Sequence, residues 1–233
     1  MKFSIDKKIF EEFPLLNIGV IIAKEINNEG EDAEIFSMQS ATSNIIRADF
    51  SLETFKDEPK INNWREAYKT FGAKPKKYSS SIENLVRMIL EGIDLRSINK
   101  VVDIYNYISL KYIVPVGGDD IDKIDGDIVL HFAKGNEPFK KLNSDEIDNP
   151  KEGEVIYSDD KEVLCRRWNW RECDKTKMTQ QTKNIMLVVE GIPPLTDNEI
   201  IKITDELGSL IKKFCGGEIL TFHLNIEKQE IEF

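Results

Sequence analysis

Apolar side chains recur at the spacing of an α-helix in several parts of the chain. Two of these stretches also begin with a capping box, in which a Ser or Thr and a Glu three residues later satisfy the first backbone N–H groups of a helix. Ser80 and Glu83 form the first box, and Thr196 and Glu199 form the second. We therefore predict that a helix begins after each box.

Weaker helical patterns predict four more helices. They cover residues 6–13, 40–55, 64–71 and 97–112. In the last of these, Asn99, Asp103 and Asn106 form a polar stripe beside the apolar one. Short polar side chains in such a row bond readily to nearby backbone, so we expect them to hold a neighbouring loop or a ligand.

Runs of β-branched and alternating residues predict strands, mostly in the second half of the chain. They lie at residues 17–26, 127–133, 154–159, 162–168, 184–191 and 218–227. No internal repeat or long linker separates these strands from the helices. We therefore predict a single α+β domain over residues 1–233, with helices packed on a strand-rich half.

Composition narrows the class of protein. The chain has 233 residues and a net charge of −10, and no apolar run reaches the roughly 18 residues that span a bilayer. We expect a cytoplasmic protein without a membrane partner, whose oligomeric state the sequence leaves open. Three cysteines and two histidines show no metal-ligand spacing, so we expect no metal and no cofactor.

One octet, CRRWNWRE at residues 165–172, combines two tryptophans with three arginines in an otherwise acidic chain. As a regular strand, it would place Arg166, Trp168 and Trp170 on one face, and Arg167 and Arg171 on the other. Tryptophan can stack on a base and arginine can bind phosphate, so we predict a binding site here. The alternative is a core strand whose tryptophans only fill volume.

A second basic stretch covers residues 65–77 and includes Lys74, Lys76 and Lys77. Local basic patches can hold a phosphate backbone even on an acidic protein. We predict that these lysines and Arg171 form an RNA-binding patch at the mouth of a pocket. A solvated charged surface is the alternative for either stretch taken alone.

Several phrases, in order, resemble the editing module of the phenylalanyl-tRNA synthetase β-subunit. They are INKVVDIYNYISL, VPVGGDDIDKIDGDIVLHF, GEVIYSD and TKNIMLVVEG, within residues 80–195. The resemblance implies the module's β-sandwich-like half, and tRNA or aminoacyl-tRNA as the partner. It further implies a pocket near Tyr105, Asn106, Pro115, Gly117, Gly118, Thr182 and Asn184.

The module that this chain resembles hydrolyses tyrosine esterified to the wrong tRNA, and the chain is too short to hold a synthetase core. The resemblance therefore implies a deacylase acting in trans on an amino acid that the sequence does not identify. Gly117 stands at the module's pocket histidine and Val188 at its glutamate, with Glu190 on the same strand face. Tyr105 replaces a threonine, so catalytic residues are not assigned.

Three functions stay open at this point. The first is the deacylase, and the second is a noncatalytic module that binds tRNA or a free amino acid. The third is a protein-interaction module that uses the acidic surface. For the first two, we predict that the backbone amides of Gly117 and Gly118 contact the substrate carbonyl while Trp168 or Trp170 closes the pocket.

Overall fold

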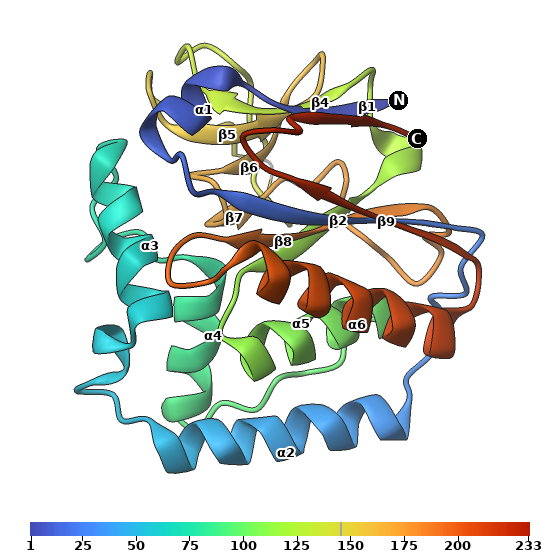
Figure 1. Cartoon of the computed structure of the whole chain (residues 1–233). Coiled ribbons are helices and arrows are strands. Elements are labelled where there is room, and N and C mark those ends of the chain that lie inside the picture. Colours follow the sequence, from blue (N-terminus) through green and yellow to red (C-terminus); the bar gives the residue numbers. More distant parts are fainter. Residues whose placement is uncertain (145) are drawn as a thin grey trace.

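The structure is a computed structural model that describes residues 1–144 and 146–233. Two β-sheets lie one above the other, and helices cover the outer face of the second sheet (Figure 1). The predicted α+β class, with helices packed on a strand-rich half, is confirmed. Within the described part of the chain, no helix has the length and apolar character needed to cross a membrane.

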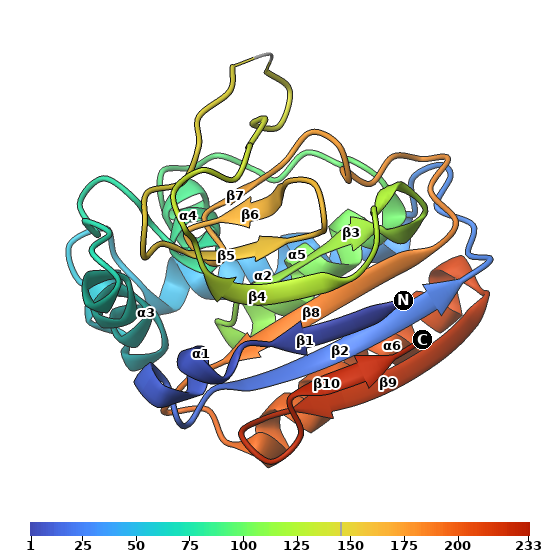
Figure 2. The same ribbon diagram turned by 90° about the horizontal axis from the view of Figure 1, so that it is seen from above.

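The first sheet has six strands in the order β10-β1-β4-β5-β6-β7. These strands are β1 (Lys2–Ile5), β4 (Ile128–Phe132), β5 (Val155–Ser158), β6 (Val163–Arg166), β7 (Arg171–Glu172) and β10 (Glu230–Glu232). β1 runs parallel to β4 and antiparallel to β10, so the two ends of the chain lie side by side (Figure 2).

The second sheet has four antiparallel strands in the order β3-β8-β2-β9. They are β2 (Asn17–Lys24), β3 (Val116–Asp120), β8 (Ile185–Gly191) and β9 (Glu218–Leu224). β2 and β8 are buried along nearly their whole length, because the first sheet covers one face and helices cover the other. Their near-continuous Val, Ile and Leu content follows from burial on both faces.

Six α-helices complete the fold. They are α1 (Lys7–Glu12), α2 (Ala33–Asp49), α3 (Pro59–Thr70), α4 (Ser81–Leu90), α5 (Lys100–Tyr112) and α6 (Asp197–Cys215). Both predicted capping residues are confirmed: Ser80 Oγ accepts from Glu83 N, and Thr196 with Glu199 forms the full reciprocal box. Asn99 is the N-cap of α5, which explains one member of the polar stripe.

Buried apolar side chains form three clusters. One fills the space between the two sheets, one lies between the four-stranded sheet and α2, α5 and α6, and a smaller one joins α2, α4 and α5. Trp64 and Trp168 are among the largest fully buried side chains of the first cluster, where their rings meet edge to face at 5.0 Å. Trp168, one of the two tryptophans of the octet, is therefore part of the inter-sheet core.

Candidate functional site

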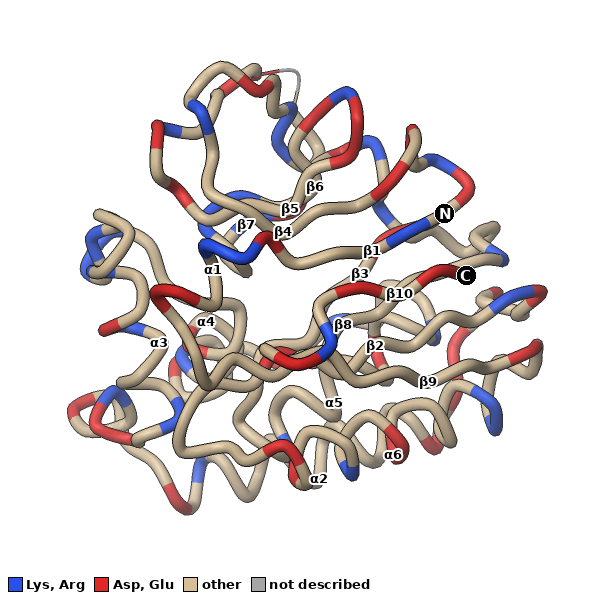
Figure 3. The backbone as a smooth tube through the Cα atoms, turned by 45° about the horizontal axis from the view of Figure 1, so that its top comes forward, with Lys and Arg blue, Asp and Glu red and all other residues tan. Residues whose placement is uncertain are grey.

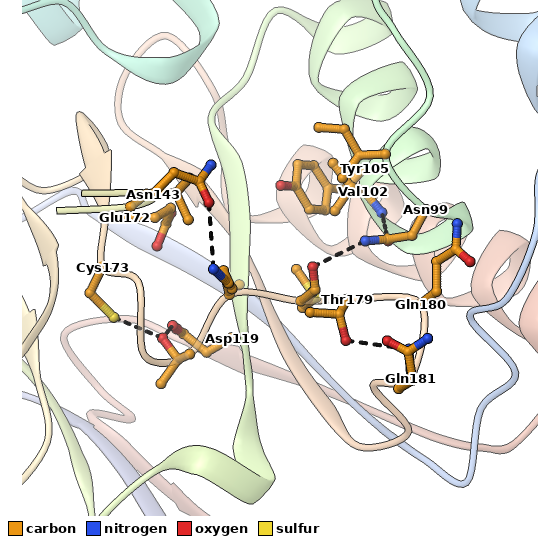
Figure 4. A pocket seen from close by; sticks show the side chains of 16 residues that line it. Asn99, Val102, Tyr105, Asp119, Asn143, Glu172, Cys173, Thr179, Gln180 and Gln181 are labelled. Carbon is orange, nitrogen blue, oxygen red and sulfur yellow. Dashed lines mark hydrogen bonds between the residues drawn. The ribbon is translucent and has the colours of Figure 1, made fainter. Parts of the chain in front are cut away.

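An open cavity of 470 Å³ lies where α5, β3, β7 and the segment 176–181 meet. We call it the outer cavity. Figure 4 shows Asn99, Val102 and Tyr105 of α5 on one side, with Glu172 and Cys173 on the other. Its volume lies within the range of pockets that hold small ligands.

A smaller space of 30 Å³, the inner cavity, lies deeper between the two sheets. Gly118, Asp119 and Glu172 line both cavities, so they form the boundary between them. The inner walls include Gly117, Tyr157, Cys165, Trp168, Asn169, Val188 and Glu190. This space is about the volume of one water molecule.

Two glycines of β3 shape the boundary in different ways. A Cβ on Gly117 would stand 3.1 Å from Glu172 Oε1, so the missing side chain leaves the inner cavity open. A Cβ on Gly118 would lie 2.1 Å from the carbonyl oxygen of Met186, so close packing against β8 requires glycine there. Of these two glycines, only Gly117 could therefore be replaced by a larger residue, and its side chain would then limit the size of the ligand.

The β3–β8 register decides which backbone amides are free. Glu190 N donates to Pro115 O, and Gly117 pairs with Val188. The backbone N–H and C=O groups of odd-numbered residues of β3 therefore point toward β8. Asp120 N instead donates to Thr176 O on the opposite side. Backbone groups alternate along an antiparallel strand, so the Gly118 N–H points away from β8, on the outer-cavity side. Of the two predicted amide donors, the register frees only Gly118.

Two carboxyl groups at the boundary carry raised pKa values. Burial raises the pKa of Asp119 to about 6, although Thr176 Oγ1 donates to it at 2.5 Å. Burial, followed by the negative charges of Asp119 and Glu190, raises the pKa of Glu172 well above its ordinary range. Two carboxyls that share a site resist losing both protons, so this pair holds a proton near neutral pH.

A third carboxyl, Glu190, ends a buried hydrogen-bond chain below the inner cavity. Tyr157 Oη donates to Glu190 Oε1 at 2.5 Å, and Asn169 Nδ2 donates to Oε2 at 2.8 Å. Tyr68 Oη completes the chain by donating to Asn169 Oδ1 at 2.9 Å. Trp168 Nε1 lies beside the same carboxyl without forming a hydrogen bond. Burial outweighs these donors and raises the pKa of Glu190 to about 7.

These raised pKa values predict that stability falls as the pH rises from about 4.5 to 7. The folded chain keeps a proton on Glu190 that the unfolded chain releases near its ordinary pKa of 4.5. Stability is therefore full below that value and is lost as the pH passes through the folded pKa, by about 3 kcal/mol for this group. Urea unfolding of Glu190→Gln at a series of pH values should show a flatter profile than the parent.

The matched control for this profile is Glu218→Gln, which removes an exposed carboxylate on β9. Its stability should follow the pH profile of the parent protein. Equal slopes for the parent and Glu190→Gln would show that Glu190 does not retain its proton.

The outer and inner cavities contain almost no positive charge. Lys177 is the one Lys or Arg among the residues that line them, within the described chain. Its Nζ forms an ion pair with Asp174 Oδ1 at 2.8 Å. Asp174 lies outside the group of Asp119, Glu172 and Glu190, which we call the carboxyl cluster. The site therefore suits a ligand with a positive charge and without a free carboxylate.

The structure brings four of the predicted pocket residues together. Tyr105 lines the outer cavity, Gly117 and Trp168 line the inner one, and Gly118 lines both. Val188 and Glu190 also line one cavity, which confirms that they share a strand face. The positions that match the module's histidine and glutamate therefore meet across the β3–β8 ladder.

Other predicted pocket residues stabilise surrounding structure. They lie outside the two cavities: Asn106, Pro115, Arg166, Arg167, Trp170, Thr182 and Asn184. Thr182 Oγ1 donates to Asp120 Oδ2 at 2.7 Å, and Asn184 Nδ2 donates to the Asp122 carboxylate. Pro115 contributes only its carbonyl oxygen to Glu190 N, as described above.

The predicted alternation of the octet is wrong. β6 ends at Arg166, and Arg167 and Trp168 adopt left-handed backbone conformations with φ of 47° and 66°. This turn buries Trp168 and lets the chain return as β7. Arg166 donates three hydrogen bonds to Glu154, at 2.8, 3.0 and 3.1 Å, so it neutralises a buried carboxylate instead of facing a pocket with the tryptophans.

The predicted RNA-binding lysines lie in the loop between α3 and α4, at the edge of the molecule (Figure 3). Lys74, Lys76 and Lys77 are exposed, as is Arg171 at the start of β7. Lys74 and Lys77 line a separate groove that also contains Arg167, so the two basic stretches do meet. None of the three lysines lines the outer or inner cavity.

The carboxyl cluster itself went unpredicted, apart from the strand face of Glu190. Asp119 lies in the phrase VPVGGDDIDKIDGDIVLHF, from which only Pro115, Gly117 and Gly118 were assigned to a pocket, and Glu172 is the last residue of an octet chosen for its arginines. The sequence GGDD could have indicated this site. Two glycines directly before two acidic residues allow the backbone and a carboxyl group to lie close to the same ligand.

Comparison with known proteins agrees with the resemblance noted in the sequence. Part of the chain is similar to phenylalanine–tRNA ligase β-subunits, with 32% identity over 120 residues in Fusobacterium nucleatum, covering 51% of this chain and 14% of that protein. The Colwellia psychrerythraea subunit is 38% identical over 70 residues, covering 30% of this chain and 9% of that subunit. The matched part is thus a small fraction of those subunits.

A solved N-terminal fragment of the phenylalanyl-tRNA synthetase β-subunit from Pyrococcus horikoshii aligns with 95% of this chain and 53% of the fragment, at 14% identity and a TM-score of 0.46. The model of the B3/4 domain family matches residues 63–216, which include α4, α5, β3, β7 and β8. Both cavities are built from these elements. The chain belongs to the B3/4 domain family.

Proposed function

We propose that this protein hydrolyses, in trans, the ester bond between an amino acid and a tRNA. The observation that carries the proposal is the cluster of Asp119, Glu172 and Glu190 around cavities without an unpaired cation. The similarity to synthetase β-subunits supports the same class of ligand.

The charge of the site favours an ester over a free amino acid. A free amino acid carries a carboxylate, which the carboxyl cluster repels and no unpaired Lys or Arg in the described lining receives. An aminoacyl ester has lost that negative charge and keeps its ammonium group. Its ammonium can pair with the ionised Asp119, which lowers the raised pKa of that carboxyl.

The same groups supply the elements of ester hydrolysis. At neutral pH, Asp119, with its pKa of about 6, is largely ionised and can orient a water molecule as a general base. Glu172 retains the proton of the pair and can donate to the departing ribose oxygen. The Gly118 N–H on the free edge of β3 can stabilise the negative charge that develops on the carbonyl oxygen.

A panel of labelled aminoacyl-tRNAs tests the proposal. The protein should shorten the lifetime of at least one ester, and Asp119→Asn should slow that hydrolysis by about a hundredfold or more, because a general base is lost. Glu218→Gln should hydrolyse like the parent. Ester lifetimes that are unaffected by the parent protein across the whole panel would contradict the proposal.

A noncatalytic binding module is the second candidate. It is favoured by Gly117 and Val188, the positions that the resemblance matches to the histidine and the glutamate of the editing module. Such a module would bind an aminoacyl-tRNA and leave its ester intact. The panel separates the two candidates when binding and hydrolysis are measured on the same samples.

A further inference from the structure

A third cavity, of 270 Å³, lies apart from the outer and inner cavities and forms a basic groove between the α3–α4 loop and the turn that joins β6 to β7. Its cationic lining residues are Lys74, Lys77, Lys151 and Arg167. The three lysines are exposed, and no salt bridge engages them within the described residues. Lys77 lies 5.1 Å from the centroid of the Tyr78 ring, at the side of the groove.

Arg167 gives this groove a buried donor without an acceptor. Its side chain is 5% exposed, and Nη2 donates to Glu154 Oε1 at 2.9 Å. Nη1 is buried and has no hydrogen-bond partner among the residues that the structure describes. An unsatisfied donor on a charged group is energetically unfavourable, so an acceptor supplied from the groove would be stabilising.

Two aromatic rings restrict how Arg167 can bind. Its Cζ lies 3.7 Å from the centroid of the Tyr78 ring and 4.5 Å from that of Trp170. Rings near a guanidinium occupy its faces and leave its edge, where the N–H groups lie, for hydrogen bonds. Arg167 also has the left-handed φ of 47°, a conformation that non-glycine residues adopt rarely. The turn thus holds the guanidinium in one fixed place.

The acidic side chains near the groove do not cancel its charge. Glu154 is buried and already receives two hydrogen bonds from Arg166 Nη2 and one from its Nε. Glu152 is exposed and is the only other acidic residue among the described residues that line the groove. The groove therefore keeps a positive excess, unlike the outer and inner cavities.

We propose that the basic groove is a phosphate-binding site. A phosphate group offers several charged oxygens, which Arg167 Nη1, Lys74 and Lys77 can bind together. The ligand is a phosphate carried by RNA or by a small phosphorylated molecule. The site is independent of ester hydrolysis, since none of its residues belongs to the carboxyl cluster.

Isothermal titration with inorganic phosphate at low ionic strength tests the site directly. The parent should bind saturably, and K74Q/K77Q should weaken binding about tenfold, as expected when charged hydrogen-bond donors are lost. K76Q removes an exposed lysine of the same loop that does not line the groove, and should leave binding unchanged. Absence of binding in the parent, or equal weakening in K76Q, would overturn the proposal.

Arg167→Lys adds a second test, because lysine keeps the charge beside Glu154 but has no counterpart of Nη1. It should also weaken phosphate binding, provided that circular dichroism shows a native fold. Parent-like affinity in this variant would remove Arg167 from the site. If the variant does not fold, the lysine pair still decides the proposal.

Titration with tRNA distinguishes the sources of the phosphate. If RNA supplies it, K74Q/K77Q should weaken tRNA binding and reduce its log–log salt slope by about one per lost contact. If a small molecule supplies it, the same variant should lose affinity for phosphate only. Either result supports phosphate binding in the groove, and neither depends on whether the protein hydrolyses an ester.

Discussion

Replacing Glu154 by Gln should lower the free energy of unfolding by about 3 to 5 kcal/mol, the effect expected when a buried ion pair loses one partner. Glu154 is buried and accepts from both Arg166 and Arg167. The neutral amide would leave these two guanidinium groups with one carboxylate fewer. Arg166 would retain Asp148, at 2.6 Å, while Arg167 would keep only an uncharged amide oxygen as its acceptor. Urea denaturation measures the loss.

Glu152→Gln is the matched control, because Glu152 lies two residues away and is exposed. Its stability should stay close to that of the parent, as is usual for exposed charges. An equal, small effect of both substitutions would mean that water already solvates the two arginines. The pairing with Glu154 would then not explain the conformation of the octet.

Gly117→Val should reduce the affinity for an aminoacyl ester by roughly a hundredfold, the scale of loss that small displacements in a site produce. Its Cβ would already stand 3.1 Å from Glu172 Oε1, and two more methyl groups would enter a space of 30 Å³. Gly117 does not have a positive φ, so valine fits the strand backbone. Equilibrium binding of a nonhydrolysable ester analogue measures the effect.

Gly117→Ala provides a graded comparison at the same position. It should weaken binding less than valine, because it adds the Cβ without the further methyl groups. Circular dichroism must show a native fold for both variants. Parent-like binding by the valine variant would place the ligand away from the inner cavity.

The capped helices could be predicted because their signals are local, whereas the weak pattern over residues 40–55 misplaced α2, which covers Ala33–Asp49. Ser80 and Thr196 bond to backbone within the same helical turn, so the capping boxes require no information about the rest of the fold. The strands β2 and β8 were predictable for a related reason: burial on both faces demands continuous apolar sequence. The α+β class followed from these elements.

Tertiary contacts decided what the sequence did not predict. VGGDD is interpreted naturally as a turn, yet pairing with β8 makes it the edge strand β3. The octet has the alternation of a strand, yet Glu154 binds Arg166 and Arg167, and Trp168 is buried in the inter-sheet core. Both outcomes depend on residues far away in the chain, which local patterns do not include.

The candidate site likewise contains some residues that were predicted and others that were not. Tyr105, Gly117 and Gly118 were predicted from the resemblance, and the cavities contain them. Asp119 and Glu172 were not predicted, because they come together only when β3 and β7 lie at one opening. A carboxyl becomes a candidate for chemistry when its surroundings raise its pKa, and the sequence does not give those surroundings.

If the carboxyl cluster receives an aminoacyl ester rather than a free amino acid, the two classes of ligand should bind with different affinities. Equilibrium binding of 3′-aminoacylamido-adenosine analogues, whose amide resists hydrolysis, can be compared with binding of the corresponding free amino acids. We predict that at least one analogue binds at least about tenfold more tightly than its free amino acid. Asp119→Asn should weaken that binding, because the ammonium group loses its partner. Equal or tighter binding of the free amino acids would contradict the claim.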